Sequence, residues 1–248
     1  GATIRNVDYE IRQFDIFSFQ TSTNYKENLR AVVPLTSFVF DNSTNGYTGP
    51  VDGFKQYLTF QFSPDIGSNS IPFQTLKFDM RKYYKINRNY SLAARLMLGK
   101  SVGDKPQKFF LGGNSQMMIF SDTQTEGRDD SGFYAQRVLD YVFPLRGARY
   151  RERVGENVAV ANFEFRFPFV NYVDVSFPAR IRFGNIFGHL FVDVGAAWDS
   201  SDEFDNSELV RNKYGLSDPK ASPILTTFCI GTKIFTPFAL IRIDTALD

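Results

Sequence analysis

This 248-residue chain contains one histidine and one cysteine, two residue types that often take part in catalysis or metal binding. His189 lies in the stretch FGHLF, and Cys229 lies in the stretch TTFCIG. A histidine works in a catalytic triad only when a nucleophile and an orienting acid are within hydrogen-bond reach. Asp193 is close in sequence, but no nucleophile accompanies the pair. The chain also lacks CxxC, HExxH and phosphate-loop spacings. The sequence therefore predicts a protein that is not an enzyme, with no catalytic residue, no metal site and no cofactor.

Charged side chains instead recur at every second position of several segments, with aromatic side chains between them. The stretch VANFEFRFPF (160–169) is the clearest case, since Phe163, Phe165 and Phe167 alternate with Asn162, Glu164 and Arg166. This alternation predicts a strand with one apolar and one polar face. In a soluble sandwich the phenylalanines would form the core. In a membrane barrel they would face lipid, and the charges would line the interior.

The same alternation predicts the elements that must position these side chains. We expect nine strands, near residues 5–20, 30–41, 54–63, 73–84, 89–99, 157–169, 187–199, 222–235 and 238–247. Many reach the ~9–11 residues that cross a bilayer when tilted, against ~5–6 in globular proteins. Tight turns join some strands, whereas the stretch from about 100 to 156 is far longer. Short turns on one side and long loops on the other are typical of outer-membrane barrels.

Composition narrows the class of protein further. Phenylalanine occurs 27 times and tyrosine 12 times, and both residues favour strands. A net charge of +1 gives no reason to expect nucleic acid as a partner. No apolar run approaches the ~18–20 residues of a membrane-spanning helix. Strand length, aromatic content and uneven loops favour a membrane barrel over a soluble sandwich or a lipocalin-like barrel, which alternation alone leaves open.

Several motifs together resemble one family. The stretch FPLRGARYRERVGEN (143–157) directly precedes the strand near 157–169, and the other segments are FFLGG, LFVDVGAAWD and FTPFALIRID. As a set they resemble the BamA/TamA-type outer-membrane barrels, the outer membrane protein eighty-five superfamily, also called bacterial surface antigens. The family's sixth extracellular loop carries a (V/I/L)-R-G-(F/Y) motif that folds back into the lumen. The matching residues are Leu145, Arg146 and Gly147, with Ala148 in place of the aromatic.

The resemblance implies an all-β, antiparallel, up-and-down transmembrane β-barrel with sixteen strands. The nine predicted strands map best onto strands seven to fifteen, so we expect residues 1–248 to be one incomplete barrel domain. The loop of about 100–156 is expected to fold toward the lumen. The implied location is the bacterial outer membrane. An acidic, Ser/Gly-rich insertion at 121–132 is similar to that of family members in which the barrel follows a β-propeller.

The resemblance also assigns roles to residues. In the family the loop arginine pairs with acidic residues on the next two strands, which implies that Arg146 contacts Glu164 and Asp193. Both carboxylates lie on the polar face by alternation, and an unpaired, desolvated guanidinium would be costly. The lipid-facing residues are then Phe163, Phe165 and Phe167. A ring that replaces the motif's missing aromatic could come from Tyr141 or Tyr150.

The implied function is insertion of other barrels into the outer membrane, or translocation of proteins across it. The alternative is a non-catalytic anchor or interaction barrel within a larger complex, without insertase activity. The expected partners are outer-membrane lipid, lipopolysaccharide, other protein subunits and unfolded outer-membrane protein clients.

Overall fold

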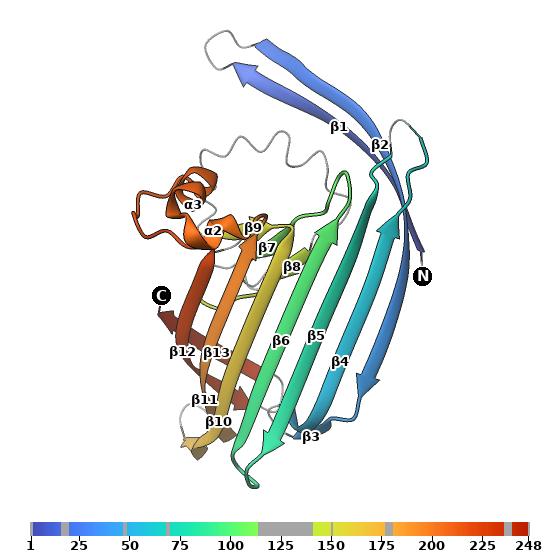
Figure 1. The fold of residues 1–248 in the computed structure, drawn as a ribbon. Helices are drawn as coiled ribbons and strands as arrows, with labels where there is room; N and C mark the ends of the chain where they lie inside the picture. Colours follow the sequence, from blue (N-terminus) through green and yellow to red (C-terminus); the bar gives the residue numbers. More distant parts are fainter. Residues whose placement is uncertain are drawn as a thin grey trace.

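The computed structural model describes residues 2–15, 20–46, 49–67, 70–113, 141–149, 151–176, 181–235 and 240–247. Its main feature is a curved antiparallel sheet, in which nine strands follow in the order β1-β2-β4-β5-β6-β10-β11-β12-β13 (Figure 1). Their bounds are β1 (Ala2–Asp15), β2 (Gln20–Asp41), β4 (Gly49–Ser63), β5 (Phe73–Lys85), β6 (Ser91–Val102), β10 (Asn157–Val175), β11 (Ile181–Trp198), β12 (Ile224–Phe235) and β13 (Leu240–Leu247). Within the described residues the sheet is open, with β1 and β13 at its two ends.

The nine strands correspond one to one with the nine predicted from alternation, and the antiparallel all-β fold is confirmed. Three bounds differ substantially, and one of them is the start of β11, which lies at Ile181 rather than near 187. β2 begins at Gln20 rather than near 30, because its first half pairs with β1 in a polar stretch that has no clear alternation. β10 continues to Val175, because a bulge at Pro168 shifts its register against β11 and interrupts the pattern.

The alternation pattern did not predict several short strands and helices. β3 (Thr44–Gly46) pairs with β4 in the connection between β2 and β4. A second, three-stranded sheet consists of β7 (Phe109–Leu111), β8 (Tyr141–Phe143) and β9 (Arg153–Gly155), in the order β8-β7-β9. Two short helices, α2 (Asp202–Asp205) and α3 (Ser207–Tyr214), follow β11. Among the described residues, no helix is long and apolar enough to cross a membrane.

The connections are as uneven as the sequence predicted. At one end of the sheet, residues 86–90 join β5 to β6, and β12 ends and β13 begins. At the opposite end, the segment between β6 and β10 carries the second sheet, and the segment between β11 and β12 carries both helices (Figure 1). We call the first of these ends the short-turn end and the second the long-loop end.

A hydrophobic cluster fixes the second sheet against the inner face of the main sheet, which is the face that carries Glu164 and Asp193. Its members are Met97, Phe109, Leu111, Phe143, Leu145, Val158, Val160 and Ala197. Gly99 of β6 makes this contact close, since a Cβ there would lie 3.0 Å from the Phe109 ring. The cluster therefore holds the end of β8, and the residues that follow it, against the wall formed by β10 and β11.

Candidate functional site

Leu145 sets the position of the loop motif. Its side chain is fully buried in the cluster, and its backbone forms an isolated bridge with Gly113. The Leu145 side chain packs on Gly195 of β11, where a Cβ would be 3.0 Å from the side chains of both Leu145 and Leu111. The missing side chain at Gly195 thus lets the loop lie directly on the wall. The next residue, Arg146, then reaches the wall's polar side chains.

The guanidinium of Arg146 lies between the two carboxylates that the resemblance implied. Its Nε donates to Asp193 Oδ2 at 2.7 Å and its Nη2 to Asp193 Oδ1 at 2.6 Å. Its Nη1 donates to Glu164 Oε2 at 3.1 Å. The side chain of Asp193 is wholly buried, whereas that of Arg146 is 20% exposed. Paired, charge-assisted hydrogen bonds of this kind fix both distance and orientation.

Two further contacts hold the motif. The Arg146 Cζ lies 3.4 Å from the centroid of the Phe191 ring, and the Thr227 hydroxyl donates to the Arg146 carbonyl oxygen at 2.6 Å. Phe191 therefore presents an aromatic ring to the motif, although Ala148 stands where the family has one. Ala148 itself packs against the hydrophobic cluster. The side chains of Tyr141 and Tyr150, the rings considered from sequence, lie outside the described residues.

Further polar contacts extend from Glu164 along the inner face to the short-turn end. Arg166 Nε donates to Glu164 Oε1 at 2.6 Å, and Arg166 Nη1 donates to the Pro50 carbonyl oxygen, also at 2.6 Å. Lys233 Nζ lies 3.5 Å from Glu164 Oε1. Pro50 belongs to the β3–β4 hairpin, so Arg166 connects the carboxylate that holds the loop to a turn at the opposite end of the sheet.

Arg166→Gln is expected to lower the free energy of unfolding by about 1.5–3 kcal/mol, the usual range for hydrogen bonds to charged groups. The β3–β4 hairpin should also become more accessible, because its Pro50 carbonyl loses its donor. Limited proteolysis of the full-length protein, with cleavage sites in 41–53 mapped by mass spectrometry, measures this. Arg88→Gln is the control, since Arg88 is an exposed arginine in the turn between β5 and β6. Equal cleavage of Arg166→Gln and the native protein would contradict the connection.

The phenylalanines of β10 lie on the opposite, outer face. Phe163 is 59% exposed. Phe165 stacks between Tyr90 and Phe167, with ring centroids 6.0 Å and 5.7 Å away. Glu164 and Phe163 are neighbours in sequence, so pairing of Glu164 with Arg146 leaves the phenylalanines to the outer face.

His189 has a different partner from the one considered from sequence. Its Nε2 lies 2.7 Å from Asp244 Oδ1 of β13, not beside Asp193. The contact spans β12 at Gly231, where a Cβ would lie 2.4 Å from His189 Nε2. Cys229, the single cysteine of the chain, is buried nearby. The pair is therefore a cross-strand contact between β11 and β13.

A second ionic cluster lies at the long-loop end, outside the strands. Lys108 Nζ is 2.8 Å from Asp199 Oδ1, and Lys213 Nζ is 3.0 Å from Asp199 Oδ2 and 2.9 Å from Glu203 Oε1. Burial acts to raise the pKa of Asp199, but hydrogen bonds from Lys108 and Lys213 outweigh it, so that pKa lies below 3.8. Tyr214 of α3 donates to the Val154 carbonyl at 2.8 Å. These contacts hold α3 on β9.

Asp199→Asn is expected to loosen α2 and α3 at neutral pH. Because the folded-state pKa of Asp199 is lowered, its stabilisation is fully present above pH 3.8 and is lost as pH falls through the lowered pKa. The difference between the native protein and the variant should thus shrink in acid. Hydrogen exchange of residues 199–223, followed from pH 7 to about pH 2, measures it. A difference that stays constant over this range would contradict the assignment.

A curved sheet of long antiparallel strands, polar inside and apolar outside, with a loop held inside it, defines an outer-membrane barrel protein. The sequence matches the Omp85 superfamily domain over residues 2–248, and the chain belongs to that superfamily. The protein is therefore a bacterial outer-membrane protein, as the resemblance implied.

Comparison with known proteins supports the fold as well. Among solved structures, the chain is similar to BamA from Haemophilus ducreyi lacking POTRA domains 1–3. The TM-score is 0.59 at 13% sequence identity, over 91% of this chain and 40% of that chain. The present chain thus spans well under half of that BamA chain. No curated protein matches the sequence.

Sequence reasoning missed several residues of this site. Phe191 and Lys233 lie on inward positions that alternation could have identified, because they share a face with Asp193 and Thr227. The Thr227 hydroxyl and the Pro50 carbonyl had no sequence signal. Their contacts depend on where the loop and the hairpin fold against the sheet, which local pattern does not specify.

Proposed function

We propose that this protein inserts other proteins into the outer membrane or translocates them across it. The observation that carries the proposal is the Arg146 site, in which one loop arginine is held by Asp193 and Glu164 inside the curved sheet. Membership of the Omp85 superfamily supports the same class of activity. Unfolded outer-membrane proteins are the proposed clients, and other protein subunits and lipopolysaccharide are the proposed partners.

The proposed role of the site is mechanical rather than catalytic. The loop contacts β10 and β11 through ion pairs and β12 through the Thr227 hydroxyl, so it braces three neighbouring strands from inside. Because the loop braces this part of the wall, deformation during client insertion occurs in the rest of the barrel. No bond is made or broken in this proposal, and no cofactor takes part.

Reconstitution tests this function directly. The full-length protein is placed in liposomes, and a urea-denatured outer-membrane barrel is added as client. The folded fraction is measured over time by heat-modifiable migration. We expect the native protein and Arg149→Ala to accelerate folding over empty liposomes, and Arg146→Ala to lose most of the acceleration. Arg149 is the matched control because it lies in the same loop and is exposed.

A second candidate function is an anchor or interaction barrel without insertase activity. The acidic, Ser/Gly-rich insertion at 121–132 favours it, since such an insertion on the family's extracellular loop suits binding of a partner. This segment lies outside the described residues. Liposomes in which the native protein gives no acceleration, together with a stable complex after mild detergent extraction, would support the anchor.

We also propose that Phe163, Phe165 and Phe167 contact lipid. In a background where Cys229 is replaced by alanine, a cysteine at 163 should react with a membrane-soluble maleimide and not with a charged, water-soluble one. A cysteine at the exposed turn residue Arg88 should react with both and serves as the control. Rapid reaction at 163 with the charged reagent would reverse the assignment of the two faces.

A further inference from the structure

An apolar groove of about 710 Å³ crosses the outer face of the sheet from β5 to β13. Its volume is within the ~300–1,000 Å³ of small-molecule sites. Strand register shows that one wall is a single row of neighbouring residues, one from each strand. This row consists of Lys82, Ala94, Phe163, Val192 and Phe228.

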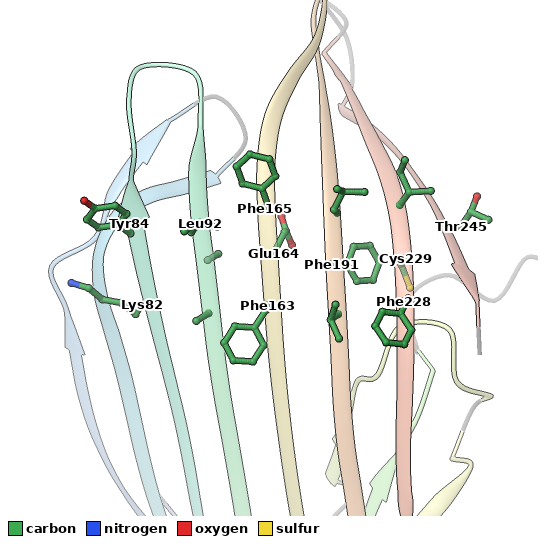
Figure 2. Close-up of a pocket in the computed structure, with 15 residues that line it drawn as sticks. Lys82, Tyr84, Leu92, Phe163, Glu164, Phe165, Phe191, Phe228, Cys229 and Thr245 are labelled. Atoms are coloured by element: carbon green, nitrogen blue, oxygen red, sulfur yellow. The ribbon is translucent and has the colours of Figure 1, made fainter.

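The second wall is the adjacent row, two residues further along each strand. It consists of Tyr84, Leu92, Phe165, Leu190, Ile230 and Thr245. Figure 2 shows Phe163 and Phe165 on the near side of β10, with Glu164 behind the ribbon. Ala94 is the small member between Lys82 and Phe163, and it leaves the groove open at that point.

The groove has the length and slope of a lipid chain in one leaflet. It spans six strands, which is roughly 24 Å at about 4.8 Å per step. Strands of such barrels tilt by about 45°, so the groove rises roughly 17 Å along the membrane normal, close to half of a ~30 Å hydrocarbon core. Its two ends lie at different heights. Lys82 is near the short-turn end of β5, at Lys85, and Phe228 is near the long-loop end of β12, at Ile224.

Charge distinguishes the two ends of the groove. Lys82 is the charged residue that its walls present outward, because Glu164 points inward to Arg146 and Arg166. No ion pair joins Lys82 to a carboxylate in the part of the chain that the structure describes. Tyr84 adds a hydroxyl beside it. A lysine at a membrane boundary extends its ammonium to the headgroup level, and a tyrosine there does the same with its hydroxyl.

We propose that this groove is a binding site for a glycerophospholipid of the periplasmic leaflet. The Lys82 ammonium and the Tyr84 hydroxyl hold the headgroup phosphate, and an acyl chain lies across Ala94 and onward between the two rows. Short turns face the periplasm in outer-membrane barrels, which places Lys82 at that leaflet. The site does not rest on the insertase function, because it needs only the outer face and its location in the membrane.

Native mass spectrometry of the full-length, delipidated protein tests the site. Palmitoyl-oleoyl-phosphatidylglycerol and dioleoylglycerol, which lacks a phosphate, are titrated separately. Lys82→Gln should weaken phosphatidylglycerol binding about fivefold, equivalent to ~1 kcal/mol for one lysine at an anionic surface, and leave dioleoylglycerol unchanged. Ala94→Phe, which fills the groove, should weaken both lipids. Lys85→Gln, at the exposed end of the same strand, should change neither.

Each variant is first shown to fold by heat-modifiable migration. Equal binding of phosphatidylglycerol by the native protein, Lys82→Gln and Ala94→Phe would show only generic lipid contact and would overturn the proposal. Loss of binding in Ala94→Phe but not in Lys82→Gln would overturn the phosphate contact. Displacement of phosphatidylglycerol by lipid A, with the same dependence on Lys82, would assign the site to the opposite leaflet and also overturn it.

Discussion

Arg146→Ala is expected to lower the free energy of unfolding by about 3 kcal/mol, the lower end of the range for breaking a buried ion pair. The reason is the wholly buried carboxylate of Asp193, which would lose both guanidinium hydrogen bonds and remain out of contact with water. Glu164 would lose less, because Arg166 still donates to it at 2.6 Å. The lower end of the range applies because the Arg146 side chain retains 20% exposure, so water partly replaces it.

Two variants make this result specific. Arg149→Ala removes an exposed arginine from the same loop and should change the midpoint of urea unfolding little. Arg146→Lys keeps the charge but cannot donate to Asp193 through two parallel N–H groups, so it should restore only part of the stability. Unfolding of the full-length protein in detergent is followed by heat-modifiable migration. Equal midpoints for Arg146→Ala and Arg149→Ala would show that the ion pairs contribute little.

Alternation predicted the main sheet because the two faces of each strand have different surroundings, and this difference persists along the whole strand. Strands of the wall place apolar side chains outside and polar ones inside, except where the second sheet covers the inner face, and this period of two is visible in the sequence. The prediction was wrong where that rule is interrupted, as at the Pro168 bulge of β10. The strands of the second sheet have only three residues each, too few to show a period.

The site was predictable in part for the same reason. Glu164 and Asp193 are on inward positions by alternation, and their link to Arg146 required the family resemblance. The contacts of Arg166 with Pro50 and of His189 with Asp244 could not be predicted, because each joins segments whose separation depends on the curvature of the sheet. Curvature is a property of all the strands together, so no short stretch of sequence encodes it.

Gly112→Ala is expected to destabilise the loop by about 3 kcal/mol or more, through two effects that add. Gly112 has φ +122°, where an L side chain is strained at a cost of about 1–3 kcal/mol. A Cβ there would also lie 2.2 Å from the Arg149 carbonyl oxygen, which is backbone and cannot rotate away. Overpacking of this kind costs typically 1–3 kcal/mol. Because Gly112 donates its N–H to the Phe143 carbonyl, the shift would separate β7 from β8 and move Arg146 from its carboxylates.

Gly215→Ala separates strain from overpacking. Gly215 ends α3 with φ +64°, and a Cβ there meets nothing within 4 Å, so only the strain of about 1–2 kcal/mol applies. The comparison uses urea unfolding of the full-length protein and the rate at which Ala197→Cys, buried under the loop on β11, is labelled by a water-soluble maleimide in a background where Cys229 is replaced by alanine. Gly112→Ala should lower the unfolding midpoint more and speed labelling, since the loop no longer covers β11. If the two alanine variants behaved alike, the close approach of Gly112 to Arg149 would not be what holds the loop on the wall.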